Sequence, residues 1–138
     1  MKSLWPEIFS ESKIRAPKTI LDEQGSFLGK ITGGIVDAET VEMTTFDKAK
    51  ENTAQDFGYH FHIIGRFIDN YRFRLLSFWH DIGMYPFTIK LDSQLAKEMG
   101  IAEKFSISTQ EEFIDLLESA LLTRRVETVV ASILSLSK

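Results

Sequence analysis

The stretch from Tyr59 to Leu91 limits what this chain can fold into more than any other part of the sequence. It contains most of the aromatic residues and all three histidines. Successive side chains of a β-strand point to opposite faces of the sheet, and apolar residues recur at every second position here. The pattern predicts three consecutive antiparallel strands, over residues 58–68, 71–80 and 85–91.

Two short loops join these predicted strands. Directly paired residues of antiparallel strands share one face, so each loop is expected to contain an odd number of residues. Residues 68–70 form the first predicted loop, with Asn70 in the left-handed conformation. Residues 81–83 form the second, with Gly83 in that conformation. Pro86 lacks a backbone donor, which predicts that the third strand begins at an edge of the sheet.

This register predicts two different faces for the sheet. The odd-numbered face is expected to pack in the core, through Tyr59, Phe61, Ile63, Phe67, Phe73, Leu75, Trp79, Tyr85, Phe87, Ile89 and Leu91. The opposite face is expected to carry His60, His62, Ile64, Arg66, Arg72, Arg74, Leu76, Phe78 and His80.

Two segments are expected before the first of these strands. Pro17 is typical of a first helical turn, and the apolar spacing after it predicts a helix over 17–31. Gly25 and Gly29 lie inside that helix, where glycine is unfavourable, so we expect them to allow close packing on the sheet. Residues rich in β-branched side chains at 35–46 predict a strand.

Further helices are expected after the meander. Asp92 or Ser93 is placed to cap a short helix that stops at Gly100, and Phe105 and Ile107 indicate a possible short strand. Thr109 and Thr123 are placed to cap two later helices, which the sequence allows to be separate or continuous.

The whole chain of 138 residues has the length of one domain. We predict a single α+β domain over 1–138, with a four-stranded or five-stranded antiparallel meander and helices packed mainly on one face. Residues 1–16, with Ile8 and Phe9, are predicted to be a peripheral N-terminal segment laid against the domain. Residues 47–57 are predicted to be an exposed loop.

The composition limits the classes of function. The chain contains no cysteine, which excludes disulfides and thiolate metal sites. The N-terminus lacks the apolar core of a signal peptide and no run reaches membrane-spanning length, so we expect a cytoplasmic protein without membrane contact. The net charge of −4 gives no overall attraction to nucleic acid, so we do not expect nucleic acid as a partner.

The three histidines suggest one possible site. His60 and His62 share a strand face, and the predicted register places His80 diagonally across from His60, beside Asp81. Imidazoles and a carboxylate are zinc ligands. The alternative interpretation is a half-exposed face whose polar positions happen to be histidine, or histidines that hydrogen-bond to a covering segment. We favour this alternative and expect no metal or other cofactor.

Arginines on the same face suggest another possible site. Arg66, Arg72 and Arg74 lie with His60, His62, Phe78 and His80 in a mixture that could meet phosphate, carboxylate or stacked bases. Arginine is also common on the solvent side of antiparallel strands. These seven residues are the candidate binding residues predicted from the sequence.

Apolar residues exceed what a two-layer domain needs. Ile64, Leu76 and Phe78 are placed on the face opposite the core. The last helix adds an apolar stripe through Val126, Val129, Val130 and Ile133, although two or three helices cover one sheet face. The surplus indicates either an additional covering segment or an interface with a second copy or a partner protein.

No catalytic motif was found. The chain lacks a nucleophile elbow, a Walker loop, a zinc-protease motif and a dinucleotide fingerprint. Ser77 is predicted on the opposite face from His80, which argues against a triad of these residues with Asp81. We therefore predict a small protein that acts through protein–protein contacts rather than catalysis. The alternative is a metal-dependent or nucleotide-handling enzyme that uses the histidine and arginine face.

Overall fold

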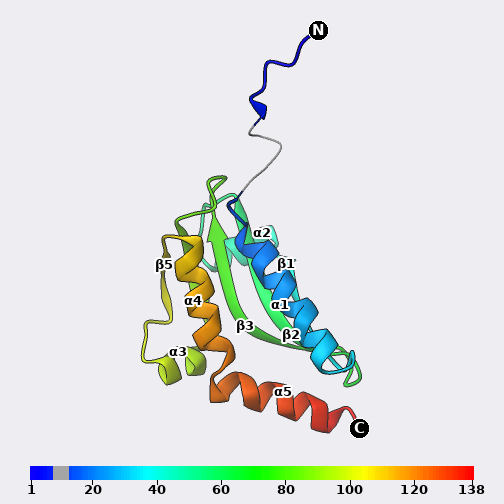
Figure 1. Ribbon diagram of the computed structural model, residues 1–138. Coiled ribbons are helices and arrows are strands. Elements are labelled where there is room, and N and C mark those ends of the chain that lie inside the picture. The colour runs from blue at the N-terminus through cyan, green and yellow to red at the C-terminus, as the bar shows by residue number, and fades with distance from the viewer. Residues whose placement is uncertain (8–12) are drawn as a thin grey trace.

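The computed structural model describes residues 1–7 and 13–138 and contains helices and strands in the predicted order. The elements are α1 (Pro17–Ile31), β1 (Val36–Glu42), α2 (Thr45–Lys50), β2 (Phe57–Gly65), β3 (Tyr71–His80), β4 (Phe87–Leu91), α3 (Ser93–Met99), β5 (Lys104–Ile107), α4 (Gln110–Leu121) and α5 (Arg124–Leu136). The strands form one antiparallel sheet in the order β1-β2-β3-β4-β5 (Figure 1). The α+β class is confirmed, and the possible fifth strand is present.

The hairpin of β2 and β3 contains a β-bulge that the sequence analysis did not predict. Phe61 pairs with Leu76, whereas His62 pairs with Arg74, so Leu75 is an extra residue in β3. Leu75 and Leu76 both join the buried core, where they are 0% and 1% exposed. The bulge reverses the alternation of side chains in the second half of β3.

The predicted faces are therefore wrong for the residues after the bulge. Phe78 pairs with Tyr59 and lies on the core face, whereas Trp79 pairs with Gly58 on the opposite face. The predicted loop 68–70 is also too short, because β2 ends at Gly65. Asn70 does adopt the predicted left-handed conformation, with φ 54°. Phe67 lies in this turn and is 66% exposed, so it is not a core residue.

The connection between β3 and β4 also differs from the prediction. It spans residues 81–86, and Met84 rather than Gly83 has a positive φ, of 69°. β4 lies between β3 and β5, so its predicted edge position is wrong. Pro86 precedes the first residue of β4, Phe87, and its missing donor therefore does not interrupt the ladder. The predicted core residues Phe87, Ile89 and Leu91 are confirmed, at 0–2% exposure.

Side-chain caps define the ends of the helices after the sheet. Asp92 accepts a hydrogen bond from the backbone of Leu95, and Gly100 ends α3 in the left-handed conformation, as predicted. Thr109 caps α4 and Thr123 caps α5. The last two helices are separate. α4 ends at Leu121, Thr123 caps the start of α5, and α5 begins at Arg124.

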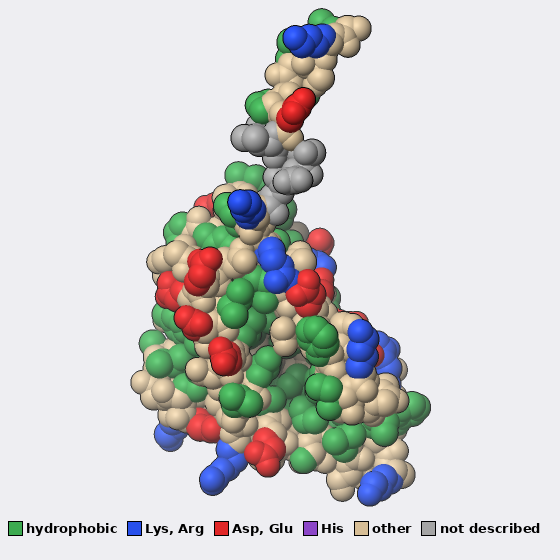
Figure 2. Space-filling model, viewed as in Figure 1, with side chains coloured by type: hydrophobic (Ala, Val, Ile, Leu, Met, Phe, Trp, Pro, Cys, Tyr) green, Lys and Arg blue, Asp and Glu red, His purple; other side chains and the backbone are tan. Residues whose placement is uncertain are grey.

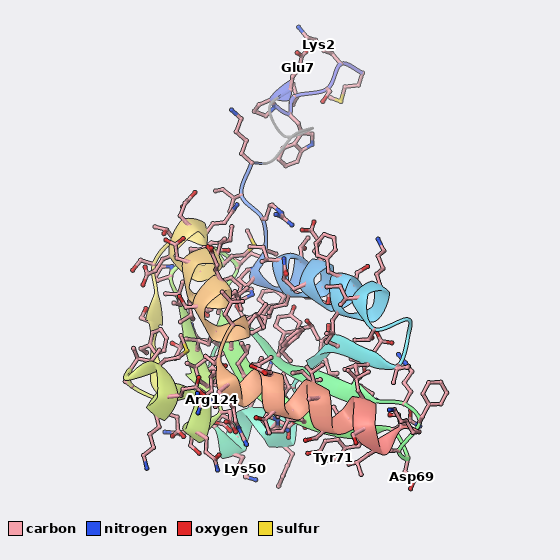
Figure 3. All side chains as sticks on the ribbon, turned by 60° about the horizontal axis from the view of Figure 1, so that its bottom comes forward. Lys2, Glu7, Lys50, Asp69, Tyr71 and Arg124 are labelled. Carbon is pink, nitrogen blue, oxygen red and sulfur yellow. The ribbon has the colours of Figure 1, made fainter. Side chains whose placement is uncertain are left out.

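Most helices pack on one face of the sheet. α1 lies against β1, where Gly25 faces the backbone of Ala38. α4 packs through Phe113, whose ring meets that of Phe87 on β4 at a centroid distance of 5.0 Å. α5 crosses the end of the sheet, from Arg124 towards the β2–β3 turn that carries Asp69 (Figure 3). The predicted position of the helices is confirmed for this layer.

Helix α2 lies on the other face and occupies the start of the segment 47–57, for which the sequence predicts a loop. Thr44 and Asp47 cap it reciprocally, side chain to backbone. Asp47 and Glu51 contact His60 and Lys90, which project from the face opposite α1. The view of Figure 3 shows α1 and α2 on opposite sides of the sheet.

The N-terminal segment is described only in part. Residues 8–12, which include the Ile8 and Phe9 that were expected to contact the domain, lie outside the described residues. Leu4 is 85% exposed. In the described part of the chain, no helix has both the length and the apolar character needed to cross a membrane.

Candidate functional site

Four of the predicted binding residues meet on the side of the sheet that α2 partly covers. We call this side the polar face and define it by His60, His62, Arg72, Arg74 and Ser77. The strand pairing places His62 directly across from Arg74 and His60 directly across from Ser77. Cross-strand neighbours of this kind are close enough for their side chains to interact.

Phe78 and His80 do not belong to the polar face. Phe78 is fully buried in the core, and His80 is 5% exposed and stacks on Phe57 at a centroid distance of 5.3 Å. His80 therefore lies on the opposite side of the sheet from His60 and His62. Across residues 1–7 and 13–138, no three or more histidine, aspartate or glutamate side chains form a group that could hold a metal ion.

Arg72 of this face and the neighbouring Arg66 form ion pairs with acidic residues of β1. Arg66 follows β2 and its Nε lies 2.7 Å from Asp37, and Arg72 lies 2.8 Å from Glu39. All four side chains are between 32% and 49% exposed, so solvent screens these pairs and each contributes about 0–1 kcal/mol. Both guanidinium groups are therefore already engaged by carboxylates, which lowers their availability for an external anion.

His60 connects the sheet to α2 through buried polar contacts. Its Nδ1 lies 2.7 Å from the hydroxyl of Ser77, and its Nε2 lies 3.4 Å from a carboxylate oxygen of Asp47. Burial and then Arg74 lower the pKa of His60, and Asp47 opposes them. The carboxylate favours the neutral tautomer with the proton on Nε2, in which Ser77 donates to Nδ1. His60 and Ser77 are both 4% exposed, so these contacts support a packing role.

His62 lies next to His60, with a distance of 5.9 Å between the ring centroids. Its Nδ1 is buried and has no hydrogen-bond partner in the described part of the chain. Burial, followed by the positive charge of Arg74, lowers the pKa of His62 to about 4. His62 is therefore neutral at pH 7 and must take up a proton when the protein unfolds in mild acid.

We expect this histidine to make the protein sensitive to acid. A folded pKa of about 4 lies below the unfolded value of 6.5, so the stabilisation is complete above pH 6.5 and is lost as the pH falls towards 4. Between pH 7 and pH 5, His62 should lower the free energy of unfolding by on the order of 2 kcal/mol. Urea unfolding of the wild type and of His62→Gln at both pH values measures this loss. An equal loss in the two proteins would show that His62 is not its source.

The opposite side of the sheet carries an apolar groove, which we call the helix groove. It lies between α1, the junction of α4 with α5, and strands β1 and β2, and its volume is about 450 Å³. Its lining residues are Gln24, Phe27, Leu28, Ile31, Ala38, Phe61, Ile63, Leu121, Leu122, Thr123, Val126, Glu127 and Val130. Figure 2 shows the groove as a hollow with hydrophobic side chains between the helices.

The divergence of two helices opens this groove. α1 and α4 start close together and separate along their length, and α5 crosses below them (Figure 1). Phe61 and Ile63 form a buried floor, at 3% and 2% exposure. The walls are different, because Ile31 and Leu122 are each 82% exposed and Phe27 is 52% exposed. The exposed apolar side chains of α1 and of the α4–α5 junction thus stand on opposite walls of one hollow.

The helix groove continues along α1 into a second hollow of about 310 Å³ between α1 and α4. The two hollows share Gln24 and Leu121. In the second hollow Arg15 forms an ion pair with Glu23. Glu118 of α4 and Glu127 of α5 also line the combined surface, and neither has an ion-pair partner among residues 1–7 and 13–138.

The sequence alone did not identify the helix groove. The apolar stripes of 17–31 and 126–136 were interpreted as core, with the surplus on the last helix noted as a possible interface. The helix-forming pattern gives the face of each helix but not the angle between two helices. Leu122 was missed for a local reason, because it is one of the two residues between α4 and α5 and belongs to neither stripe.

Comparisons with protein-family models, with curated proteins and with solved structures found no match to this chain.

Proposed function

We propose that this protein binds an apolar segment of another protein in the helix groove. One observation carries the proposal: Ile31 and Leu122, each 82% exposed, line a common hollow whose floor is apolar. Water-exposed apolar side chains are common when they are isolated, but a contiguous set that lines a concave surface is typical of a binding site. Filling the hollow would remove these side chains from water and provide most of the binding energy.

The polar face gives less support to a ligand-binding or catalytic site. Arg66 and Arg72 are paired with carboxylates, and His60 is held by Ser77. His80, which the alternative enzyme hypothesis places there, lies on the core face and stacks on Phe57. That hypothesis stays a prediction from the sequence, and no feature of the polar face favours it over protein binding.

A partner should be captured at the groove and not elsewhere on the surface. A photo-crosslinking amino acid at Leu122 should capture a protein in the native host, whereas the same amino acid at Ile82 should not. Ile82 is a matched position, since it is 80% exposed and does not line the groove. The captured protein is then purified, and its affinity for this chain is measured by calorimetry.

Charged substitutions in the groove should weaken this affinity. In the double variant Ile31→Glu with Leu122→Glu, we expect the dissociation constant to rise by about 100-fold, because two central apolar contacts cost on the order of 1–2 kcal/mol each. Ile82→Glu should leave it unchanged. All of these side chains are exposed, so folding should change by less than about 0.5 kcal/mol. An unchanged affinity in the double variant, with a folded protein, would refute the proposal.

A further inference from the structure

The distribution of charge around the helix groove indicates the kind of segment that it takes. The charged residues of α4 are all acidic and all exposed: Glu111, Glu112, Asp115 and Glu118. Figure 2 shows acidic side chains gathered over the part of the surface that α4 occupies. Glu127 adds a carboxylate from α5 at the opposite end of the groove.

The other wall does not cancel this charge. On α1, Lys18 pairs with Asp22, and Glu23 pairs with Arg15, which precedes the helix. Lys30 lies over the ring of Phe27, with Nζ 5.8 Å from the centroid. Lys30 keeps its positive charge but lines neither hollow. The charged residues that do line the two hollows are the paired Arg15 and Glu23, and Glu118 and Glu127, so the lining has a net negative charge. A ligand that buries its apolar side here therefore meets negative charge along one flank.

We infer that the helix groove takes an amphipathic helix whose apolar stripe is flanked by lysine or arginine on the side next to α4; this inference rests on the function proposed above. An amphipathic helix that lays its apolar face into a groove is a common mode of recognition. Lysine and arginine beside the stripe would complement Glu118 and Glu127 and increase the rate of association.

The same charges argue against a second copy as the occupant. A symmetric dimer brings the same surface of both subunits together, so a dimer through the helix groove would gather Glu118 and Glu127 of both copies in one interface. Like charges across an interface are unfavourable. The occupant is therefore a different, basic segment.

A displayed library of amphipathic helices tests the inference. Each member has a leucine stripe, and each flanking position carries either lysine or glutamate in equal proportion. The targets are the wild type, a double variant with Glu118→Lys and Glu127→Lys, and a control with Asp56→Lys and Glu103→Lys. The control changes the net charge equally at exposed residues that do not line the helix groove.

Selection on the wild type and on the control should enrich lysine at the flanks. Selection on the Glu118→Lys, Glu127→Lys variant should enrich glutamate, and a lysine-flanked helix should bind this variant about 10-fold more weakly than the wild type. Binding should also weaken with salt. Helices that bind the groove with equal use of lysine and glutamate would overturn the inference and leave the proposed function standing. Failure to enrich any helix that binds in the groove at Leu122 would also overturn the inference. The proposed function is tested separately, by the crosslinking experiment.

A dimer is an outcome that also counts against the inference. If the wild type sediments as a dimer at high concentration and Ile31→Glu with Leu122→Glu makes it a monomer, the groove is occupied by a second copy. That result would overturn the basic helix as the occupant.

Discussion

Replacement of Phe113 with alanine should lower the free energy of unfolding by about 3–5 kcal/mol, which is a large part of the stability of a domain of this size. Phe113 is fully buried, and its ring meets Phe87 edge to face at an interplanar angle of 89°. It joins α4 to β4, so alanine would leave a cavity between helix and sheet. Urea unfolding followed by circular dichroism measures the loss.

A second phenylalanine provides a matched control for this substitution. Phe67 lies in the β2–β3 turn and is 66% exposed, so Phe67→Ala should change the free energy of unfolding by less than about 0.5 kcal/mol. Both substitutions remove the same atoms, and only burial distinguishes them. Equal effects of the two substitutions would show that α4 does not pack on the sheet as described.

The parts of the fold that were predicted correctly depend on local signals. Pro17 begins α1, Asp92 caps α3, Gly100 ends it, and Thr123 begins α5, each for a reason contained in a few neighbouring residues. The order of strands follows from the same kind of evidence, because short connections join neighbours in an antiparallel sheet.

The errors come from features that no local pattern determines. The bulge at Leu75 adds one residue to one strand, and a period of two then assigns Phe78 and Trp79 to the wrong faces. Both residues are apolar and buried, so hydrophobicity could not distinguish their faces. The same error affected the candidate site, because Phe78 and His80 were predicted on the polar face and lie on the core face.

The helix groove shows a further limit of the sequence pattern. Each stripe of apolar residues was identified, but whether a stripe is buried depends on the distance between helices. Phe27 and Ile31 follow the same spacing as the buried Ile20, yet they are exposed because α1 and α4 have separated by that point (Figure 1). The difference between core and binding surface is thus set by helix packing angles, which depend on the whole domain.

Replacement of Gly25 with alanine should destabilise the protein, although alanine is the better helix former. In an exposed helix the change would stabilise by about 1 kcal/mol. Here an added Cβ would lie 2.4 Å from the carbonyl oxygen of Ala38, which belongs to the backbone of β1 and cannot rotate away. We expect α1 to be forced from the sheet, with a net loss of about 2 kcal/mol in the free energy of unfolding.

Gly29 is the matched control, because it lies four residues later in the same helix and the sequence suggests the same role for both glycines. An added Cβ there would lie 3.3 Å from a carboxylate oxygen of Asp37, a side chain that can rotate away. Gly29→Ala should therefore be neutral or stabilise by up to about 1 kcal/mol. Urea unfolding should show a lower free energy of unfolding for Gly25→Ala and no loss for Gly29→Ala. An equal change in the two variants would show that α1 does not approach β1 most closely at Gly25. Since α1 forms one wall of the helix groove, Gly25→Ala should also weaken binding of the captured partner, whereas Gly29→Ala should leave it intact.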